Sequence, residues 1–172
     1  MGLLRLLSRR YVTHPPPDVE PRNVVEVRAA LLALNGPDVP WVVRDGAAEG
    51  VHFVAEWRLA EPVGRNFFVR HQLTRTLTIR MRLVPQANEV EAIEEHREVS
   101  RVGNPPRLAV GSKWGRGPAR TVSRQWVIER GSDGRRRLRQ SFSYDSNDMK
   151  GPVQQTVLDA GWSWRSLLSK NF

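Results

Sequence analysis

The chain has 172 residues and no cysteine, and its 27 lysine and arginine residues exceed 18 aspartate and glutamate residues, for a net charge of +9. A chain of this length buries about 70% of the surface that it exposes when unfolded, which is enough for one hydrophobic core. Without cysteine, a disulfide framework, a thiolate nucleophile, a cysteine zinc site and an iron–sulfur cluster are excluded. No apolar run approaches the ~20 residues of a membrane-spanning helix. We therefore expect a compact, cytoplasmic protein that uses no cofactor.

Residues 1–19 are predicted to form an N-terminal tail with a proline-rich spacer, followed by a single domain over residues 20–172. Arg5 interrupts the leucine-rich stretch, which excludes a secretory signal, and Leu6 stands where a myristoylation signal needs serine or threonine. Two interpretations of the tail remain. It is an amphipathic segment that contacts an acidic membrane surface or acts as a presequence, or it is a frayed end whose leucines pack on the domain or on a second copy.

The first element of the domain is a helix within residues 20–35. Val24, Val27, Leu31 and Leu34 recur at helical spacing, and Gly36 supplies a stop signal.

Two later segments, residues 51–59 and 73–84, alternate apolar and polar side chains at every second position. In the first segment, for example, Phe53 and Trp57 share one face and His52 and Glu56 share the other. One wet face favours an antiparallel sheet over a parallel sheet that is buried on both sides.

The remaining segments complete an α+β pattern. Strands are expected at residues 41–43, 89–102 and 107–113, and a hairpin at residues 121–130 and 135–144 around a glycine-containing turn. A second helix is predicted to begin near Pro152, with Asn147 or Asp148 as its cap, and to end at Gly161, before an apolar tail. The sequence thus predicts an antiparallel sheet of about seven strands with an N-terminal and a C-terminal helix packed on it.

Residues 41–59, which read WVVRDGAAEGVHFVAEWRL, resemble a family of small uncharacterised actinobacterial proteins, and residues 151–164, GPVQQTVLDAGWSW, are similar to the C-terminal end of that family. The resemblance implies no reaction and no site residue, because the family has no assigned activity. This chain departs from the family by its many arginines over residues 116–139.

The strongest candidate site is the basic segment of residues 113–139, which holds nine basic and two acidic residues. Arginine suits phosphates and carboxylates, and interleaved tryptophan offers stacking surfaces. The segment predicts an anion-binding face for nucleic acid, another polyanion, an acidic protein or an acidic membrane surface. Protection of a sheet edge by charge, or the codon bias of a GC-rich genome, would account for the same arginines without a partner. The predicted anion-binding residues are Arg116, Arg120, Arg124, Arg135, Arg137, Arg139 and Trp114.

Two clusters suggest chemistry more weakly. Glu94, His96 and Glu98 would share one strand face and could hold a metal or act as a general acid and base, or the acidic segment could neutralise the arginine hairpin. His52 and Glu56 could form a dyad, although any solvated strand face offers such a pair. No nucleophile elbow or phosphate-binding glycine loop occurs, so the sequence favours a non-enzymatic protein.

The alternative function is a small-ligand pocket protein or an enzyme of unrecognised class. An aromatic cavity under the sheet would be lined by Phe53, Trp57, Met81 and Trp162. The same residues could equally fill a solid core, and the sequence does not separate the two.

Overall fold

The structure is a computed structural model that describes residues 12–66, 69–102, 107–116, 120, 122–130, 132 and 134–168. Its helices are α2 (Val24–Leu32) and α3 (Asn147–Asp159), with 3-10 turns η1 (Ala47–Glu49) and η2 (Pro85–Ala87). Its strands are β1 (Val12–Thr13), β2 (Trp41–Asp45), β3 (Phe53–Asn66), β4 (Val69–Val84), β5 (Glu89–Val102), β6 (Arg107–Arg116), β7 (Val122–Arg130), β8 (Arg136–Asp145) and β9 (Ser163–Leu167).

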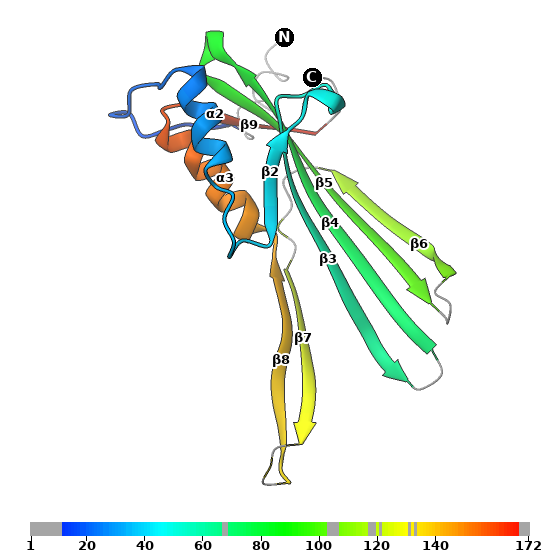
Figure 1. The fold of residues 1–172 in the computed structure, drawn as a ribbon. Helices are drawn as coiled ribbons and strands as arrows, with labels where there is room; N and C mark the ends of the chain where they lie inside the picture. Colours follow the sequence, from blue (N-terminus) through cyan, green and yellow to red (C-terminus); the bar gives the residue numbers. More distant parts are fainter. Residues whose placement is uncertain are drawn as a thin grey trace, which may run out of the picture.

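The fold is α+β, as predicted, and its main sheet is mixed (Figure 1). Within the described residues, six strands follow the order β1-β9-β5-β4-β3-β2, and a seventh strand, β6, pairs with β5. The prediction of a purely antiparallel sheet is wrong at one pairing, because β9 runs parallel to β5, with Ser163 opposite Glu89. A helix between two strands allows a parallel return, and α3 immediately precedes β9. The strands β7 and β8 form a separate two-stranded sheet.

Helix α2 begins with a capping box, in which the Asn23 side chain accepts from the Glu26 backbone and the Glu26 side chain accepts from the Asn23 backbone. These two bonds satisfy amide groups that a helix N-terminus otherwise leaves without partners. The helix buries Val27 and Leu31 and ends at Leu32, slightly before the predicted end. Just beyond it, the Asn35 side-chain amide donates to the Val43 carbonyl and accepts from the Val43 amide, both at 2.8 Å. Asn35 thus acts as a substitute strand partner for the edge strand β2.

Helix α3 begins at Asn147, with Ser146 as its N-cap, and Pro152 therefore lies inside the helix rather than at its first position. The predicted start is wrong by about one turn. Proline in a helix clashes with the Cβ of the residue before it, and that residue here is Gly151, which has no Cβ. Gly151 therefore removes this one conflict, although the proline still lacks the amide hydrogen that would bond to the Asp148 carbonyl.

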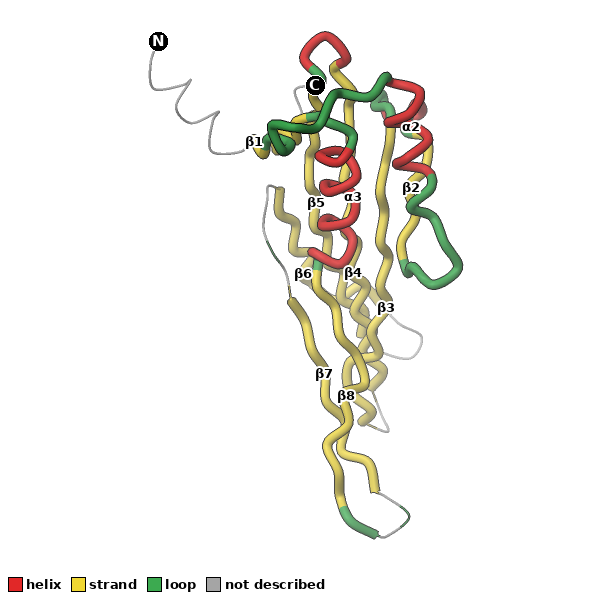
Figure 2. The backbone as a smooth tube through the Cα atoms, turned by 90° about the vertical axis from the view of Figure 1, so that its left-hand side faces the viewer, coloured by secondary structure: helices red, strands yellow, loops and turns green. Residues whose placement is uncertain are grey.

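The core lies between the two helices and one face of the sheet (Figure 2). Strand alternation is confirmed in part, since Phe53, Ala55 and Trp57 are buried on β3 and Arg58 is exposed, but Val54 on the opposite face is also buried. The predicted apolar tail is the strand β9, which places Trp164 in the core, and Trp162 is buried just before it. The helices contribute Val27, Leu31, Met149, Val153, Val157 and Leu158.

The described N-terminal segment crosses the end of α3. The Arg22 amide donates to the Ala160 carbonyl at 2.9 Å, and the Trp162 indole donates to the Arg22 carbonyl at 2.8 Å. Gly161 has φ +74°, and a Cβ there would lie 2.6 Å from the Glu20 carbonyl oxygen. Only glycine fits this crossing, because other residues strain at this φ and would meet the backbone of Glu20.

Strands β3, β4 and β5 continue past the helical layer, and the hairpin of β7 and β8 projects from the end of the molecule where α3 begins (Figures 1 and 2). None of the helices in the described part of the chain has the length and apolarity needed to cross a membrane.

Candidate functional site

The predicted hairpin is confirmed as the strands β7 and β8, which pair antiparallel from Val122 opposite Asp145 to Arg130 opposite Arg136. An irregularity in register lies between Gln125 and Trp126. At the tip, Gly134 has φ +75°, a conformation that suits glycine in a tight turn. The hairpin therefore places arginine positions on both strands near its free end.

The root of the hairpin is held by Asp145. Arg120 donates to this carboxylate from Nε at 3.1 Å and from Nη2 at 2.5 Å. The Asn147 amide, in the first turn of α3, donates to the same carboxylate at 3.0 Å. The hydrogen bond to Asp145 raises the pKa of Arg120, so this guanidinium is charged throughout. Asp145 thus joins Arg120, two residues before β7, to the end of β8 and the start of α3.

The seven predicted anion-binding residues do not form one cluster. Trp114 and Arg116 belong to β6 in the main sheet, where the register places Arg116 opposite Glu95. Arg120 is exposed at the hairpin root and is bound to Asp145, as described above. The side chains of Trp114, Arg116, Arg124, Arg137 and Arg139 lie outside the described part of the structure.

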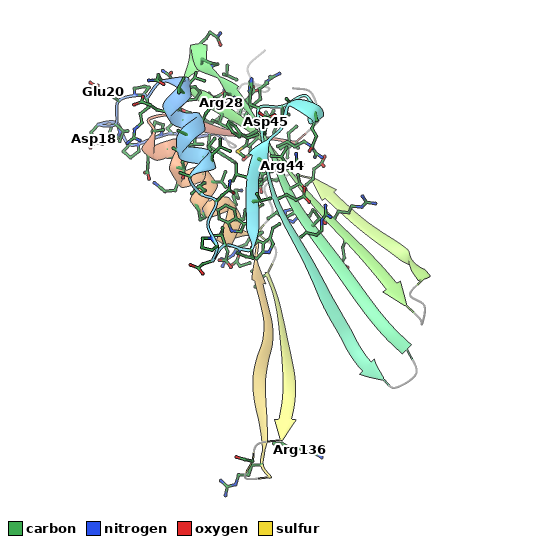
Figure 3. All side chains as sticks on the ribbon, viewed as in Figure 1. Asp18, Glu20, Arg28, Arg44, Asp45 and Arg136 are labelled. Atoms are coloured by element: carbon green, nitrogen blue, oxygen red, sulfur yellow. The ribbon has the colours of Figure 1, made fainter. Side chains whose placement is uncertain are left out.

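The backbone register nevertheless places four predicted residues along the hairpin. Arg124 lies opposite Ser143 on β7, and on β8 Arg137 lies opposite Glu129 and Arg139 opposite Val127. Arg135 is exposed just before β8. Arg136, which the sequence reasoning left out of the site, is exposed and stands at the tip (Figure 3).

Carboxylates accompany the arginines of the main sheet, on the face that points away from the helices. Arg82 on β4 lies opposite Glu91 on β5, and their side chains meet at 2.5 Å. Arg80 forms an ion pair with Glu95, and Arg165 on β9 donates to Glu89 at 2.6 Å. In these pairs the carboxylates of β5 thus neutralise arginines of β4 and β9. The pairs do not support the prediction that the acidic segment neutralises the arginine hairpin.

Ion pairs between arginine and carboxylate also occur at η1 and β2. Arg44 lies 2.5 Å from Glu49, and Arg80 donates to the other oxygen of Glu49 at 2.9 Å. The hydrogen bond from Arg44 lowers the pKa of Glu49 and outweighs the opposing effect of partial burial. In Figure 3, Arg44, Asp45 and Arg28 cluster at β2, and Arg28 also reaches Asp45 at 3.6 Å.

Glu94, one of the predicted acid–base residues, is buried beside a lysine. It faces the helices from β5, its side chain is 2% exposed, and Lys150 of α3 approaches it at 2.7 Å. Burial raises the pKa of Glu94, and the hydrogen bond with Lys150 opposes that shift. No group of three metal-binding side chains occurs among the described residues. The arrangement is an ion pair that anchors the first turn of α3 to the sheet.

The predicted His52–Glu56 dyad is replaced by two separate arrangements. His52 accepts a hydrogen bond from the Leu83 amide at Nδ1, at 2.9 Å, and so completes the ladder of β4 beyond the start of β3. Glu56 accepts from Arg58 at 2.6 Å and from Arg44 at 3.4 Å. Both residues therefore have structural partners.

The predicted pocket residues all belong to the buried hydrophobic cluster. Phe53, Trp57, Met81 and Trp162 have exposures of 0%, 4%, 0% and 1%. Their burial in one cluster with aliphatic side chains from both helices agrees with the filled-core interpretation.

Sequence reasoning missed the residues that fix the hairpin to the body, Asp145 and Lys150. The run from Asp145 to Asp148 carries the residue types of a helix start and could have identified Asp145 as a capping residue. Its bond to Arg120, which lies 25 residues earlier, follows from tertiary structure and has no local signal.

Comparisons with protein-family models, with curated proteins and with solved structures found no match. The resemblance to an actinobacterial family therefore stays a prediction.

Proposed function

We propose that this chain is a non-enzymatic binding module that presents the hairpin of β7 and β8 to an anionic partner. The observation that carries the proposal is the distribution of charge. Residues 120–145, which hold the hairpin, have seven basic and three acidic residues, and residues 1–17 have three basic and no acidic residues. The remainder of the chain then has 17 basic and 15 acidic residues, so it is almost neutral.

The local arrangement supports the same conclusion. Arg44, Arg80, Arg82 and Arg165 in the body each have a carboxylate partner, which accounts for them as structural groups. On the hairpin, the register places Arg130 directly opposite Arg136. Like charges directly opposite one another destabilise a strand pair, so these positions are better explained by an external anion than by hairpin stability.

The test is binding to heparin, a generic polyanion, by the full chain at several salt concentrations. Arg136, Arg137 and Arg139 are replaced together by glutamine. The matched control replaces Arg22, Arg58 and Arg97, three exposed arginines of the body, and changes the net charge equally. Unchanged circular dichroism and thermal unfolding would show that both variants fold.

We expect the hairpin variant to lose about tenfold or more in heparin affinity and to show a shallower dependence on salt, because fewer counterions are released. The control variant should lose no more than about threefold, through the weaker overall field. Equal losses in the two variants, or wild-type binding that is insensitive to salt, would contradict the proposal.

A further inference from the structure

We infer that the anionic partner of the hairpin is duplex DNA, and that the two strands β7 and β8 enter its major groove as a ribbon. This inference rests on the proposed function and narrows it from anions in general to one class of nucleic acid.

The dimensions of the hairpin fit the groove. β7 has nine residues and β8 has ten, and in the described part of the chain no third strand pairs with them. Nine residues span about 30 Å, and one sheet layer with its side chains is about 10 Å thick. The major groove of B-form DNA is about 12 Å wide and 8.5 Å deep and admits a two-stranded ribbon.

The position of the hairpin also leaves its tip accessible to a DNA groove. Its tip lies at the far end of the molecule from β1 and α2, and Arg136 marks that tip (Figures 2 and 3). Ser132, Gly134, Arg135 and Arg136 at the turn are all exposed, and a Cβ at Gly134 would have nothing within 4 Å. The ribbon can therefore approach a groove without a collision from the helical layer.

The charges of the ribbon are distributed for a groove rather than for a flat surface. Arg136 and Arg137 are consecutive in β8, and consecutive strand positions belong to opposite faces. Basic positions also occur on both strands, with Arg124 and Arg130 on β7. A ribbon inside the major groove is flanked by phosphates along both of its strands, so basic positions on β7 and on β8 suit this geometry.

The root of the hairpin limits the loss of freedom on binding. Asp145 links Arg120 to the first turn of α3, and Lys150 in that turn is bound to the buried Glu94. A ribbon already oriented by these contacts loses less conformational entropy when it binds.

The experiment compares ligands by fluorescence anisotropy with the full chain. The probes are a DNA duplex of about 20 base pairs, which offers the major groove of B-form DNA, and the RNA duplex of the same sequence, whose deep, narrow major groove side chains cannot read. The same DNA with glucosylated 5-hydroxymethylcytosine has a filled major groove, and netropsin occupies the minor groove of the plain duplex. Heparin and vesicles of phosphatidylserine and phosphatidylcholine complete the set.

We expect the plain DNA duplex to bind about tenfold or more tightly than the RNA duplex, because only the DNA groove admits the ribbon. Glucosylation should lower affinity by a similar factor, and netropsin should change it by less than about twofold. The Arg136, Arg137 and Arg139 triple variant should lose this binding, while the Arg22, Arg58 and Arg97 control should retain it.

Equal affinity for the DNA and RNA duplexes, no effect of glucosylation, or a preference for vesicles would overturn the inference. If heparin binding still depended on the hairpin in that case, the proposed function would stand and only the DNA assignment would fail. If no polyanion bound through the hairpin, both would fail.

Discussion

The main sheet and the hairpin use arginine in different ways. On the main sheet, Arg82 lies opposite Glu91, and Arg80 lies between Glu49 and Glu95. On the hairpin, Arg130 lies opposite Arg136. The total charge of +9 is therefore a poor guide to function by itself, because Arg44, Arg80, Arg82 and Arg165 of the body have carboxylate partners. What matters is where basic residues outnumber acidic residues locally, and that place is the hairpin, where Arg130 lies opposite Arg136 and, in the register of β7 and β8, only Arg137 lies opposite an acidic residue, Glu129.

The largest expected effect of a substitution lies in the body, at Lys150. Replacing Lys150 with alanine leaves the Glu94 carboxylate buried without its cation and should lower the free energy of unfolding by about 3 kcal/mol. The double variant Glu94→Gln with Lys150→Met removes both charges and should recover much of that loss. Urea denaturation of both variants measures the difference. A single variant as stable as the wild type would show that the ion pair does not anchor α3.

A smaller effect is expected at Gly161, and the hairpin supplies its control. Gly161 and Gly134 have nearly the same φ, +74° and +75°, but only Gly161 lies against the Glu20 backbone. Alanine at Gly134 should cost about 1 kcal/mol through backbone strain, and alanine at Gly161 about 2–3 kcal/mol through strain plus the steric conflict. Thermal unfolding of both variants checks this. Equal losses of stability in the two variants would mean that the backbone of residues 20–22 moves to accommodate a methyl group at position 161.

The pH dependence of stability should distinguish the buried carboxylate from the exposed ion pairs. Because burial raises the pKa of Glu94, the folded state binds its proton more readily than the unfolded state does. Relative to the Glu94→Gln variant, the wild type should therefore gain stability as pH falls from 7 toward 5, by no more than about 1.4 kcal/mol per pH unit. Denaturation curves at several pH values measure the gain. A relative loss on acidification would contradict the raised pKa.

The smallest expected effect on stability lies at the tip of the hairpin. Replacing Arg136 with glutamate converts a like-charge pair with Arg130 into an opposite-charge pair and should raise stability by about 0.2–1 kcal/mol. The same substitution should weaken heparin binding. A variant with unchanged stability and unchanged heparin binding would show that Arg136 neither destabilises the hairpin nor belongs to the binding surface.

The strands that pack against the helices could be predicted because their pattern is local. Phe53, Ala55 and Trp57 recur at every second position, and a half-buried strand requires that spacing. The direction of β9 could not be predicted, since it depends on the path of α3 across the sheet. The start of α3 was misplaced because proline normally marks a first turn, whereas Pro152 lies inside this helix.

The sequence predicted which segment carries the candidate site, but it did not predict which residues of that segment lie together. The glycine-containing turn indicated the hairpin, but nothing local places Arg116 opposite Glu95 in the main sheet or Arg120 on Asp145. Both pairings join residues that are far apart in the sequence and depend on how strands meet. Composition located the charge, and only tertiary structure separated the residues of the hairpin from those of the sheet.

The bond between Asn35 and Val43 has a consequence for the chemical ageing of the protein. Asn35 is followed by Gly36, and an asparagine before glycine is prone to deamidation because the glycine amide can attack the side-chain carbonyl without hindrance. Deamidation would replace the donor to the Val43 carbonyl by a carboxylate oxygen and so free the edge of β2 for association with other strands. We expect stored protein to deamidate at Asn35 and to form aggregates in parallel, which peptide mass mapping and light scattering would follow together. Aggregation at the same rate in an Asn35→Asp variant and in fresh wild type would show that this amide does not protect the edge.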